Sequence, residues 1–234
     1  MPQTDIDLAV FDIAGTTVDE GLQVYKVLEE TARAHGASPS EADINRWHGS
    51  SKHEALKALL TDAEGVAPDE ERLAHVVEDF RSRLKAAYKA YPPAALPGIE
   101  DAIRQLREAG VKVVLNTGFD RDIVDLLLDA LGWQGDVVVD GAVCGSEVPE
   151  GRPAPFMIFR AMELSGVTDR GRVLVAGDTP RDLQAGLNAG AGYVVGVLSG
   201  AGTAEELGTE RHTHILRSVA DVPQLVGLAP AEVA

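Results

Sequence analysis

The sequence predicts an α/β fold, in which a parallel sheet flanked by helices carries an inserted α-helical region. From residue 98 onward, helical patterns alternate with short apolar runs, and this alternation is typical of a parallel sheet. The stretch from 37 to about 90 is instead helical by pattern and offers no strand candidate. The proline-rich segment 91–98 would lead the chain from these inserted helices back to the sheet.

The composition describes a globular chain with a strong excess of acidic residues. Hydrophobic residues make up 45% and charged residues 25% of the 234 residues, which excludes an intrinsically disordered chain. The formal net charge of -16 opposes binding to nucleic acid and to anionic membrane surfaces. Cys144 is the single cysteine, so an internal disulfide is excluded and a small core residue is expected there. Since the N-terminus lacks a signal-peptide pattern and no apolar run could span a bilayer, we expect a soluble, cytoplasmic protein.

The first predicted strand ends at a candidate functional residue. The apolar run Leu8–Phe11 stops at Asp12, and Gly15 follows shortly after it. This pattern predicts a buried strand that delivers one carboxylate onto a tight turn. In open α/β sheets, ligands bind at the carboxyl ends of the strands, so a function for Asp12 is expected. An amphipathic helix is predicted next, over residues 20–36.

Further elements are predicted that complete the sheet and its flanking helices. Helices are expected at about 98–109, 120–131, 155–165 and 180–189, and strands at 111–116, 136–140, 172–176, 192–197 and 214–216. Like Asp12, Thr117 and Asp178 stand just after a predicted strand. Because the carboxyl ends of parallel strands meet at one edge of the sheet, we expect these side chains to lie close together.

Asp12, Thr117 and Asp178, together with Arg152 and Asp182, form a set suited to a phosphorylated ligand and a divalent cation. Mg²⁺ prefers carboxylate oxygens and water, and it accepts phosphate oxygens as further ligands. Local explanations also exist, since Asp182 stands at capping-box spacing, Thr117 could cap the next helix and Arg152 could be a surface residue. For each of these residues the structural and the functional explanation stay open at this point.

Several segments, taken in order, resemble the ordered motifs of the haloacid dehalogenase superfamily. They are Phe11–Asp19, Asn116–Gly118, Gly151–Pro153 and Gly177–Asp182. At Ala14 and Arg152 the sequence resembles more narrowly the phosphonatase branch of that superfamily, the phosphonoacetaldehyde hydrolases and their relatives. The resemblance implies a haloacid dehalogenase-like, Rossmann-like catalytic core over residues 1–18 and 94–234. It also implies an α-helical cap over 19–93, with the active site between the cap and the core.

The resemblance implies a role for each residue that matches a motif. Asp12 would be the nucleophile that attacks phosphorus and becomes an aspartyl phosphate. Mg²⁺ would be held by Asp12, by the backbone carbonyl of Ala14 and by Asp178, with Asp182 supporting its water shell. Ordinary phosphatases of the superfamily carry a second aspartate at the position of Ala14. A methyl group cannot protonate a leaving alcohol, so a different leaving group or a different proton donor is implied.

The same resemblance implies the residues that bind the substrate. Thr117, Gly118 and Arg152 would bind the phosphoryl group, for which the fork of an arginine side chain is well suited. Gly49 is also placed among the substrate-binding positions. The implied partner is a small phosphorylated or phosphonate compound.

Lys52 is the candidate for a Schiff-base lysine, which would accept the electrons of a carbon leaving group. Ser51 and Glu54 stand at capping-box spacing, so Lys52 falls in the first turn of a helix. The positive end of the helix dipole, and His48 and His53 when protonated, would favour its neutral amine. A solvated surface lysine is the structural alternative. In the phosphonatase family the Schiff-base lysine lies three residues after a glycine, as Lys52 does after Gly49.

Some positions depart from the phosphonatase pattern, since the family has methionine, histidine and tyrosine where this chain has His48, Ala55 and Phe119. The resemblance nevertheless implies a Mg²⁺-dependent, phosphonatase-like hydrolase that cleaves a small phosphonate aldehyde or ketone through Asp12 and Lys52. One alternative is a phosphatase that acts on a small phosphate monoester or acyl phosphate. A second alternative is a non-catalytic sensor of a phosphate ligand. Related proteins often pair through their caps, so a homodimer is expected by resemblance.

Overall fold

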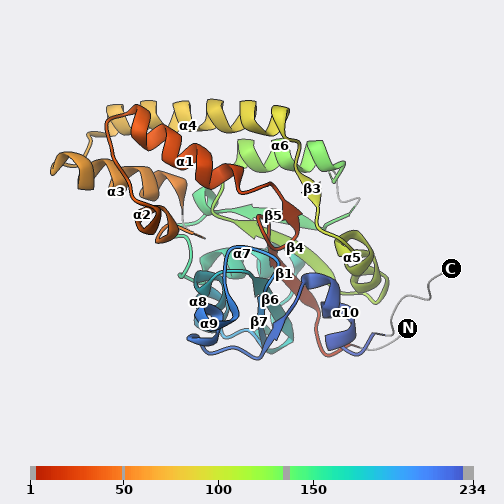
Figure 1. Cartoon of the computed structure of the whole chain (residues 1–234). Helices are drawn as coiled ribbons and strands as arrows, with labels where there is room; N and C mark the ends of the chain where they lie inside the picture. The colour runs from red at the N-terminus through yellow and green to blue at the C-terminus, as the bar shows by residue number, and fades with distance from the viewer. Residues whose placement is uncertain (1–3, 49–50, 134–137, 229–234) are drawn as a thin grey trace.

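Within residues 4–48, 51–133 and 138–228, which the computed structural model describes, the chain forms a six-stranded sheet of order β5-β4-β1-β6-β7-β8 (Figure 1). The strands are β1 (Leu8–Asp12), β4 (Lys112–Thr117), β5 (Gly141–Cys144), β6 (Val173–Gly177), β7 (Tyr193–Val197) and β8 (His214–Leu216). All neighbouring pairs are parallel, which confirms the predicted α/β fold class. β1 lies between β4 and β6, so its carboxyl end opens where the strand order reverses, the usual binding crevice of such sheets.

Helices cover both faces of the sheet, so alternate residues of β1 are buried against helices on opposite sides. The helices are α5 (Ile99–Glu108), α6 (Arg121–Leu131), α7 (Phe156–Ser165), α8 (Pro180–Ala189), α9 (Ala204–Gly208) and α10 (Val222–Leu225). Leu8 and Val10 belong to an apolar cluster with residues of α7 and α8. Ala9 and Phe11 belong to the cluster that includes α5 and α6. A strand buried on both faces is apolar throughout, which explains the uninterrupted run before Asp12.

The inserted region forms a helical layer, which we define as α1–α4. Its members are α1 (Gln23–Ala34), α2 (Glu41–Asn45), α3 (Lys52–Glu64) and α4 (Glu70–Ala90). α1 and α3 both pack against α4, and the layer occupies the upper part of Figure 1. Leu28, Leu56 and Phe80 contribute to its buried apolar side, which is continuous with the cluster on one face of the sheet. The predicted helical stretch is confirmed, whereas the domain boundaries stay a prediction.

Short strands join the helical layer to the sheet region. β2 (Val18–Asp19) and β3 (Ala94–Ala95) pair in antiparallel register, so the chain leaves the sheet region and returns to it side by side. The sequence pattern missed both strands, because a run of two residues is too short to show a period. α1 begins at Gln23, later than predicted, because Leu22 has a left-handed backbone (φ 56°) that interrupts the helical path before it.

One strand prediction is wrong in position. The apolar run at 136–140 predicts a strand, but β5 begins at Gly141, and residues 134–137 lie outside the described part of the chain. Asp140 instead binds the neighbouring strand: its carboxylate accepts a hydrogen bond from the Val113 amide (2.9 Å), and its own amide donates to the Val113 carbonyl (2.7 Å). Cys144, at the end of β5, is buried, and burial raises the pKa of its thiol to about 12, which fits the expected core residue.

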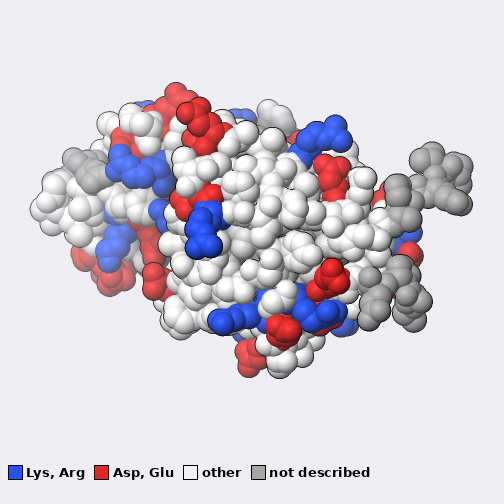
Figure 2. Space-filling model, turned by 90° about the horizontal axis from the view of Figure 1, so that it is seen from below, with Lys and Arg blue, Asp and Glu red and all other residues white. Residues whose placement is uncertain are grey.

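The surface carries acidic and basic side chains in small groups. In the view of Figure 2 these groups are interspersed and separated by uncharged surface. Several charges are paired, such as Arg172 with Asp7 (2.6 Å) and Arg104 with Asp101 (2.9 Å). Exposed pairs of this kind contribute little to stability, so the fold depends on its buried apolar clusters. Among the described residues, no helix combines the length and the apolar character needed to cross a membrane.

Candidate active site

The turn after β1 holds Asp12 at the carboxyl edge of the sheet. Asp12 is buried (5% exposed), and the Thr17 hydroxyl donates a hydrogen bond to its backbone carbonyl (2.9 Å). Gly15 has a left-handed backbone (φ 79°), and a Cβ atom added there would lie 2.8 Å from Asp178 Oδ2. Glycine is therefore required in this turn, both for its conformation and for the close approach of Asp178.

Carboxylates from β1, from the loop after β6 and from α8 converge beside this turn. Oxygens of Asp12, Asp178 and Asp182 lie within 4.8 Å of one another, and these residues are all buried. Asp178 accepts hydrogen bonds from the Thr16 hydroxyl (3.1 Å) and the Ala201 amide (2.7 Å). Burial, and then the negative charge of Asp12, raise the pKa of Asp178 to about 6. A compensating cation would relieve this crowding, and carboxylate oxygens are the donors that Mg²⁺ prefers.

Asp182 has one oxygen with a structural role and one that faces the site. Its Oδ2 accepts hydrogen bonds from the Thr179 amide (3.1 Å) and hydroxyl (2.6 Å), which completes the predicted capping box at the start of α8. Its Oδ1 forms an ion pair with Nη1 of Arg152. The local explanation for Asp182 is therefore confirmed, and it leaves the second oxygen turned toward the other carboxylates.

Arg152 lies inside the site rather than on the surface. Its side chain is 3% exposed, and its Nη1 lies 2.8 Å from Asp12 Oδ1 as well as against Asp182. Its Nε is buried without a hydrogen-bond partner among the residues that the structure describes. An oxygen of a bound anion would satisfy that donor, so the geometry suits a phosphoryl or phosphonyl group. The alternative of a surface arginine is wrong.

The end of β4 adds a buried hydroxyl to the same edge. Thr117 Oγ1 accepts a hydrogen bond from the Phe119 amide (3.2 Å) and so orders its own turn. The cap position of α6 is occupied by Asp120, so the local alternative of a capping role for Thr117 is wrong. Arg81 of α4 forms an ion pair with Asp120 (2.8 Å), which ties the helical layer to this loop. Thr117 and Gly118 line a small cavity at this edge of the sheet.

Lys52 reaches the same cavity from the helical layer. It is the first residue of α3, which Ser51 caps by accepting a hydrogen bond from the Glu54 amide (3.4 Å). Lys52 is 6% exposed, and its Nζ lies 4.9 Å from the ring centroid of Tyr25 and 5.9 Å from that of Phe119. The predicted place in the first helical turn is confirmed, and the alternative of a solvated lysine is wrong.

The surroundings of Lys52 favour its neutral amine. Burial, and then the positive charge of Arg152, lower the pKa of Lys52 to about 8, against the opposing effects of Asp12 and Glu20. Burial also lowers the pKa of His48 to about 4, so this imidazole is neutral near pH 7. The expected contribution of a protonated His48 is therefore wrong, and desolvation has the larger effect on the amine.

Residues from the sheet edge and from the helical layer enclose this inner cavity together. Most of the predicted site residues line it: Asp12, Lys52, Thr117, Gly118, Arg152 and Asp178. Ala14 lines it as well. The free volume of about 20 Å³ is room for about one water molecule. Gly49, which the sequence also places in the site, lies outside the described residues.

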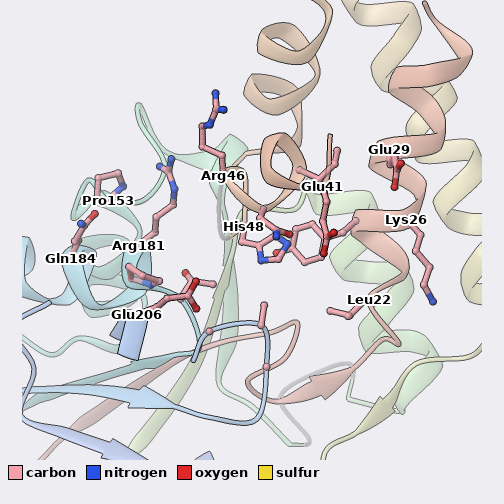
Figure 3. Close-up of a pocket in the computed structure, with 18 residues that line it drawn as sticks. Leu22, Lys26, Glu29, Glu41, Arg46, His48, Pro153, Arg181, Gln184 and Glu206 are labelled. Atoms are coloured by element: carbon pink, nitrogen blue, oxygen red, sulfur yellow. The ribbon is translucent and has the colours of Figure 1, made fainter. Parts of the chain in front are cut away.

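A larger pocket, which we call the vestibule, lies outside the inner cavity (Figure 3). Residues of α1 and α2 line one side of it, and residues of α8 and of the loop after β7 line the other. Its volume is about 1190 Å³. Tyr25 and Thr179 line both spaces, so the vestibule adjoins the inner cavity.

Tyr25 and Glu20 also belong to the surroundings of Lys52, although no sequence motif marks them. The Tyr25 ring lies beneath the Lys52 amine and 4.0 Å from the His48 ring, centroid to centroid. Glu20 is buried, its carboxylate accepts a hydrogen bond from the Tyr88 hydroxyl (3.3 Å), and burial raises its pKa. Tyr25 lies at the edge of the apolar side of α1 and packs against the core cluster, so the sequence pattern marks it only as a core-facing aromatic residue.

Comparison with known proteins agrees with this geometry. The profile of the haloacid dehalogenase-like hydrolases matches residues 6–190, so the chain belongs to this family of hydrolases. Within the family it is similar to phosphonoacetaldehyde hydrolase from Bacillus cereus. The two are 32% identical over 227 residues, which cover 92% of this chain and 83% of that protein. The resemblance to the phosphonatase branch is confirmed.

Solved structures share the fold at lower sequence identity. The phosphonoacetaldehyde hydrolase-like protein from Oleispira antarctica has a TM-score of 0.80 at 21% identity, covering 97% of this chain and 94% of that one. A protein described as a predicted phosphoglycolate phosphatase from Haemophilus somnus has a TM-score of 0.75 at 18% identity, covering 96% and 99%. Since one fold hosts many reactions, these likenesses show the shared architecture only. The substrate has to be inferred from the residues of the site.

Proposed function

We propose that the protein is a Mg²⁺-dependent, phosphonatase-like hydrolase that cleaves the carbon–phosphorus bond of a small phosphonate aldehyde or ketone. The observation that carries this proposal is the buried Lys52 amine, which lines the same small cavity as the Asp12 carboxylate. The similarity to phosphonoacetaldehyde hydrolase supports the same chemistry. The proposed partner is therefore a small phosphonate that carries a carbonyl group.

In this proposal Asp12 is the nucleophile. Its carboxylate attacks phosphorus, the carbon–phosphorus bond breaks, and an aspartyl phosphate forms. Arg152, 2.8 Å from Asp12 Oδ1, would bind phosphonyl oxygens beside the attacking atom. Thr117 and Gly118 line the cavity next to it and would donate further hydrogen bonds to the same group.

The carboxylate cluster fits a Mg²⁺ ion. Asp12, Asp178 and Asp182 concentrate negative charge in a buried place, and the raised pKa of Asp178 reflects that crowding. Asp12, Asp178 and the backbone carbonyl of Ala14 would hold the ion, with Asp182 ordering its water. When bound, the ion would offset the negative charge shared by the carboxylate and the phosphonate.

Lys52 would carry the leaving group. Its neutral amine adds to the substrate carbonyl and, with loss of water, forms an imine that is protonated on nitrogen. When Asp12 attacks phosphorus, the electron pair of the broken bond passes into this iminium and leaves an enamine. Protonation of the enamine carbon and hydrolysis then release the aldehyde or ketone and restore Lys52. A second water hydrolyses the aspartyl phosphate, so the net products are the carbonyl compound and inorganic phosphate.

Ala14 supports the choice of a carbon leaving group. Its methyl group lines the cavity at the position where an alcohol leaving group would need a proton donor. A carbon that departs as an enamine needs no proton at the moment of bond breaking. The combination of Ala14 and Lys52 therefore favours carbon–phosphorus cleavage over ester hydrolysis.

Entry of the substrate requires an opening motion. An inner cavity of about 20 Å³ is too small for a phosphonate, so the helical layer would move away to admit the substrate and return to exclude water. We propose the cap over 19–93 as the moving unit, on a core formed by 1–18 and 94–234. The paired strands β2 and β3 would connect the two.

Release of inorganic phosphate tests the proposal. The assay compares phosphonoacetaldehyde with a panel of phosphate monoesters and acetyl phosphate, with Mg²⁺ present. The proteins are the intact chain, Lys52→Ala and Lys57→Ala, an exposed lysine of the same helix that serves as control. We expect phosphonate turnover that is lost in Lys52→Ala and kept in Lys57→Ala. Ester turnover that survives Lys52→Ala, without phosphonate turnover, would favour the phosphatase alternative.

Because the chain belongs to a family of hydrolases, the alternative of a non-catalytic sensor is not favoured. A homodimer and a cytoplasmic location stay predictions. Sedimentation of the purified protein would measure the first of these.

A further inference from the structure

The vestibule is where any part of the substrate beyond its carbonyl group would lie. The inner cavity, which Asp12 and Lys52 line, has a free volume of only about 20 Å³, so further substrate atoms need a second space. The vestibule, of about 1190 Å³, adjoins it through Tyr25 and Thr179. This inference rests on the proposed function, in which Lys52 binds the carbonyl carbon. The far end of the substrate then points into the vestibule.

Arg181 is a half-buried cation in the wall of the vestibule. In the part of the chain that the structure describes, no carboxylate lies within ion-pairing distance of its guanidinium, and its only hydrogen bond runs from Nη1 to the Arg152 carbonyl at 3.4 Å. Arg152 itself, in contrast, is paired with Asp12 and Asp182. Most donors of the Arg181 fork are therefore available to a planar anion.

The position of Arg181 suits a ligand that starts at the inner cavity. Arg181 belongs to the first turn of α8, and its side chain lines the vestibule. Its positive charge contributes to the lowered pKa of Lys52, so the guanidinium is within electrostatic reach of that amine. In Figure 3, Arg181 lies next to Pro153 in the wall of the pocket. A substrate held at Lys52 would therefore meet a cation on its outward path.

Two acidic residues of the vestibule, Glu206 and Glu29, are engaged elsewhere. Glu206 accepts hydrogen bonds from the Thr203 amide and hydroxyl, both at 2.9 Å, at the start of α9. Glu29 forms an ion pair with Arg33 (2.8 Å) on α1. Among the described residues, neither of these carboxylates nor that of Glu41 forms an ion pair with the Arg181 guanidinium, so its charge is available to a ligand.

We infer that Arg181 binds a carboxylate at the far end of the substrate, so that the preferred substrate is a carbonyl phosphonate that also carries a carboxylate group. A carboxylate matches the guanidinium fork with parallel hydrogen bonds. It takes no part in the bond changes, since the electrons of the broken carbon–phosphorus bond still pass to the Lys52 iminium. A charge-assisted contact of this kind contributes about ten- to a hundredfold in affinity.

Unreactive ligands test this inference without turnover. Calorimetry, with Mg²⁺ and fixed ionic strength, would compare alkylphosphonates with carboxyalkylphosphonates of matched chain length. In the intact protein, at least one carboxylate ligand should bind about tenfold or more tightly than its uncharged counterpart. Arg181→Gln should abolish that preference and leave the affinity for the alkylphosphonate within about twofold, because the phosphonyl group is bound by Arg152 and not by Arg181.

Lys26→Gln is the matched control. Lys26 lines the same vestibule and its substitution removes the same charge, but its amine donates to the Gly21 carbonyl (3.1 Å) and points away from His48 in Figure 3. The preference for the carboxylate should survive in this variant. Equal loss of the preference in both variants would mean general attraction by charge and would overturn the inference. An intact protein without a preference at any chain length would overturn it as well.

These outcomes are distinct from those of the proposed function. The ligands have no carbonyl group, so Lys52→Met should keep the carboxylate preference whatever chemistry Lys52 performs. Binding of alkylphosphonates without a carboxylate preference would overturn the inference alone. If no phosphonate binds at all, the phosphonyl site of the proposed function fails, and the inference fails with it.

Discussion

The sheet edge and the helical layer contribute to the candidate site in different ways. At the sheet edge, Asp12 and Asp178 follow strands, and hydrogen bonds and ion pairs with Thr16 and Arg152 fix them. The helical layer contributes the Lys52 amine, which is desolvated and lies beside the aromatic rings of Tyr25 and Phe119. The sheet edge thus contributes charged groups held in fixed positions, and the helical layer contributes an amine that is shielded from water.

This difference assigns separate parts of the proposed reaction to the two regions. Every phosphoryl compound needs the nucleophile, the carboxylates for a cation and the anion-binding guanidinium, which all come from the sheet edge. Only a carbonyl compound needs an amine. Changes at the sheet edge should therefore affect every substrate, whereas changes in the helical layer should affect carbonyl phosphonates alone.

The largest effect is expected for Asp12→Asn. An amide cannot form the aspartyl phosphate, so phosphate release from phosphonoacetaldehyde, and from any ester that the protein hydrolyses, should fall about 10⁴-fold or more. Single-turnover phosphate release measures this. Asp19→Asn, an exposed acid beyond the same turn, should keep activity within about threefold. If Asp12→Asn kept its activity on any substrate, Asp12 would not be the nucleophile.

The next effect, for Lys52→Met, should be selective. Without an amine no iminium can accept the electrons of the breaking bond, so turnover of phosphonoacetaldehyde should fall about 10³-fold or more. Binding of ethylphosphonate, which needs only the sheet edge, should be kept. Steady-state kinetics and calorimetry measure the two quantities. Loss of ethylphosphonate binding in parallel with turnover would contradict the assignment of phosphonate binding to the sheet edge alone.

Lys52→Met should also be more stable than the intact protein at pH 7. Burial lowers the pKa of Lys52 from 10.5 to about 8, which corresponds to about 3 kcal/mol of destabilisation. Because the pKa is lower in the folded than in the unfolded state, this penalty is complete below pH 8 and disappears as the pH rises toward 10.5. Thermal unfolding as a function of pH measures the gain, which should shrink over that range. A less stable variant at pH 7 would contradict a buried, charged amine.

A smaller effect is expected for Asp182→Asn at the sheet edge. A residue that orders the water of a metal ion, rather than binding the ion, typically changes metal affinity about ten- to a hundredfold. The asparagine oxygen can still accept the hydrogen bond from the Thr179 amide, so the cap of α8 is kept. The Mg²⁺ dependence of activity measures the change.

Chelation should abolish activity on every substrate, and activity that survives it would contradict the proposed metal.

The smallest effect is expected for Glu20→Gln. Attack on a carbonyl needs the neutral amine, so kcat/KM for phosphonoacetaldehyde should rise with pH and level off near 8, the pKa of Lys52. The negative charge of Glu20 raises that pKa, so its removal should move the levelling point to lower pH, by less than about one pH unit. Glu30→Gln, an exposed acid of α1, should leave the pH profile unchanged. A shift to higher pH would contradict the assigned interaction.

The sheet edge could be predicted from the sequence because its signals are local. The apolar runs before Asp12 and Thr117 stop abruptly, and parallel strands bring their carboxyl ends to one edge whatever the length of chain between them. The capping box of Asp182 is likewise a short-range pattern. β5 shows the limit of such patterns, since the strand begins at Gly141, after the apolar run that predicts it.

The helical layer could be predicted only in part. The first-turn position of Lys52 follows from its cap, but its burial depends on how α1–α4 pack over the sheet edge, which no local pattern records. Tyr25 approaches Lys52 from another helix, and Glu20 reaches Tyr88 across the layer for the same reason. The ion pair of Arg152 with Asp12 also joins distant segments, so a local explanation for Arg152 was equally consistent with the sequence.

Reductive trapping at Lys52 is the measurement that tests the carbon–phosphorus route most directly. Borohydride reduces a protonated imine to a stable amine, so the protein would be mixed with phosphonoacetaldehyde and borohydride, digested and analysed by mass spectrometry. We predict an adduct on the peptide that contains Lys52, with Lys57 unmodified and no adduct in Lys52→Met. Turnover of phosphonoacetaldehyde by the intact protein without any adduct at Lys52 would contradict the proposed function.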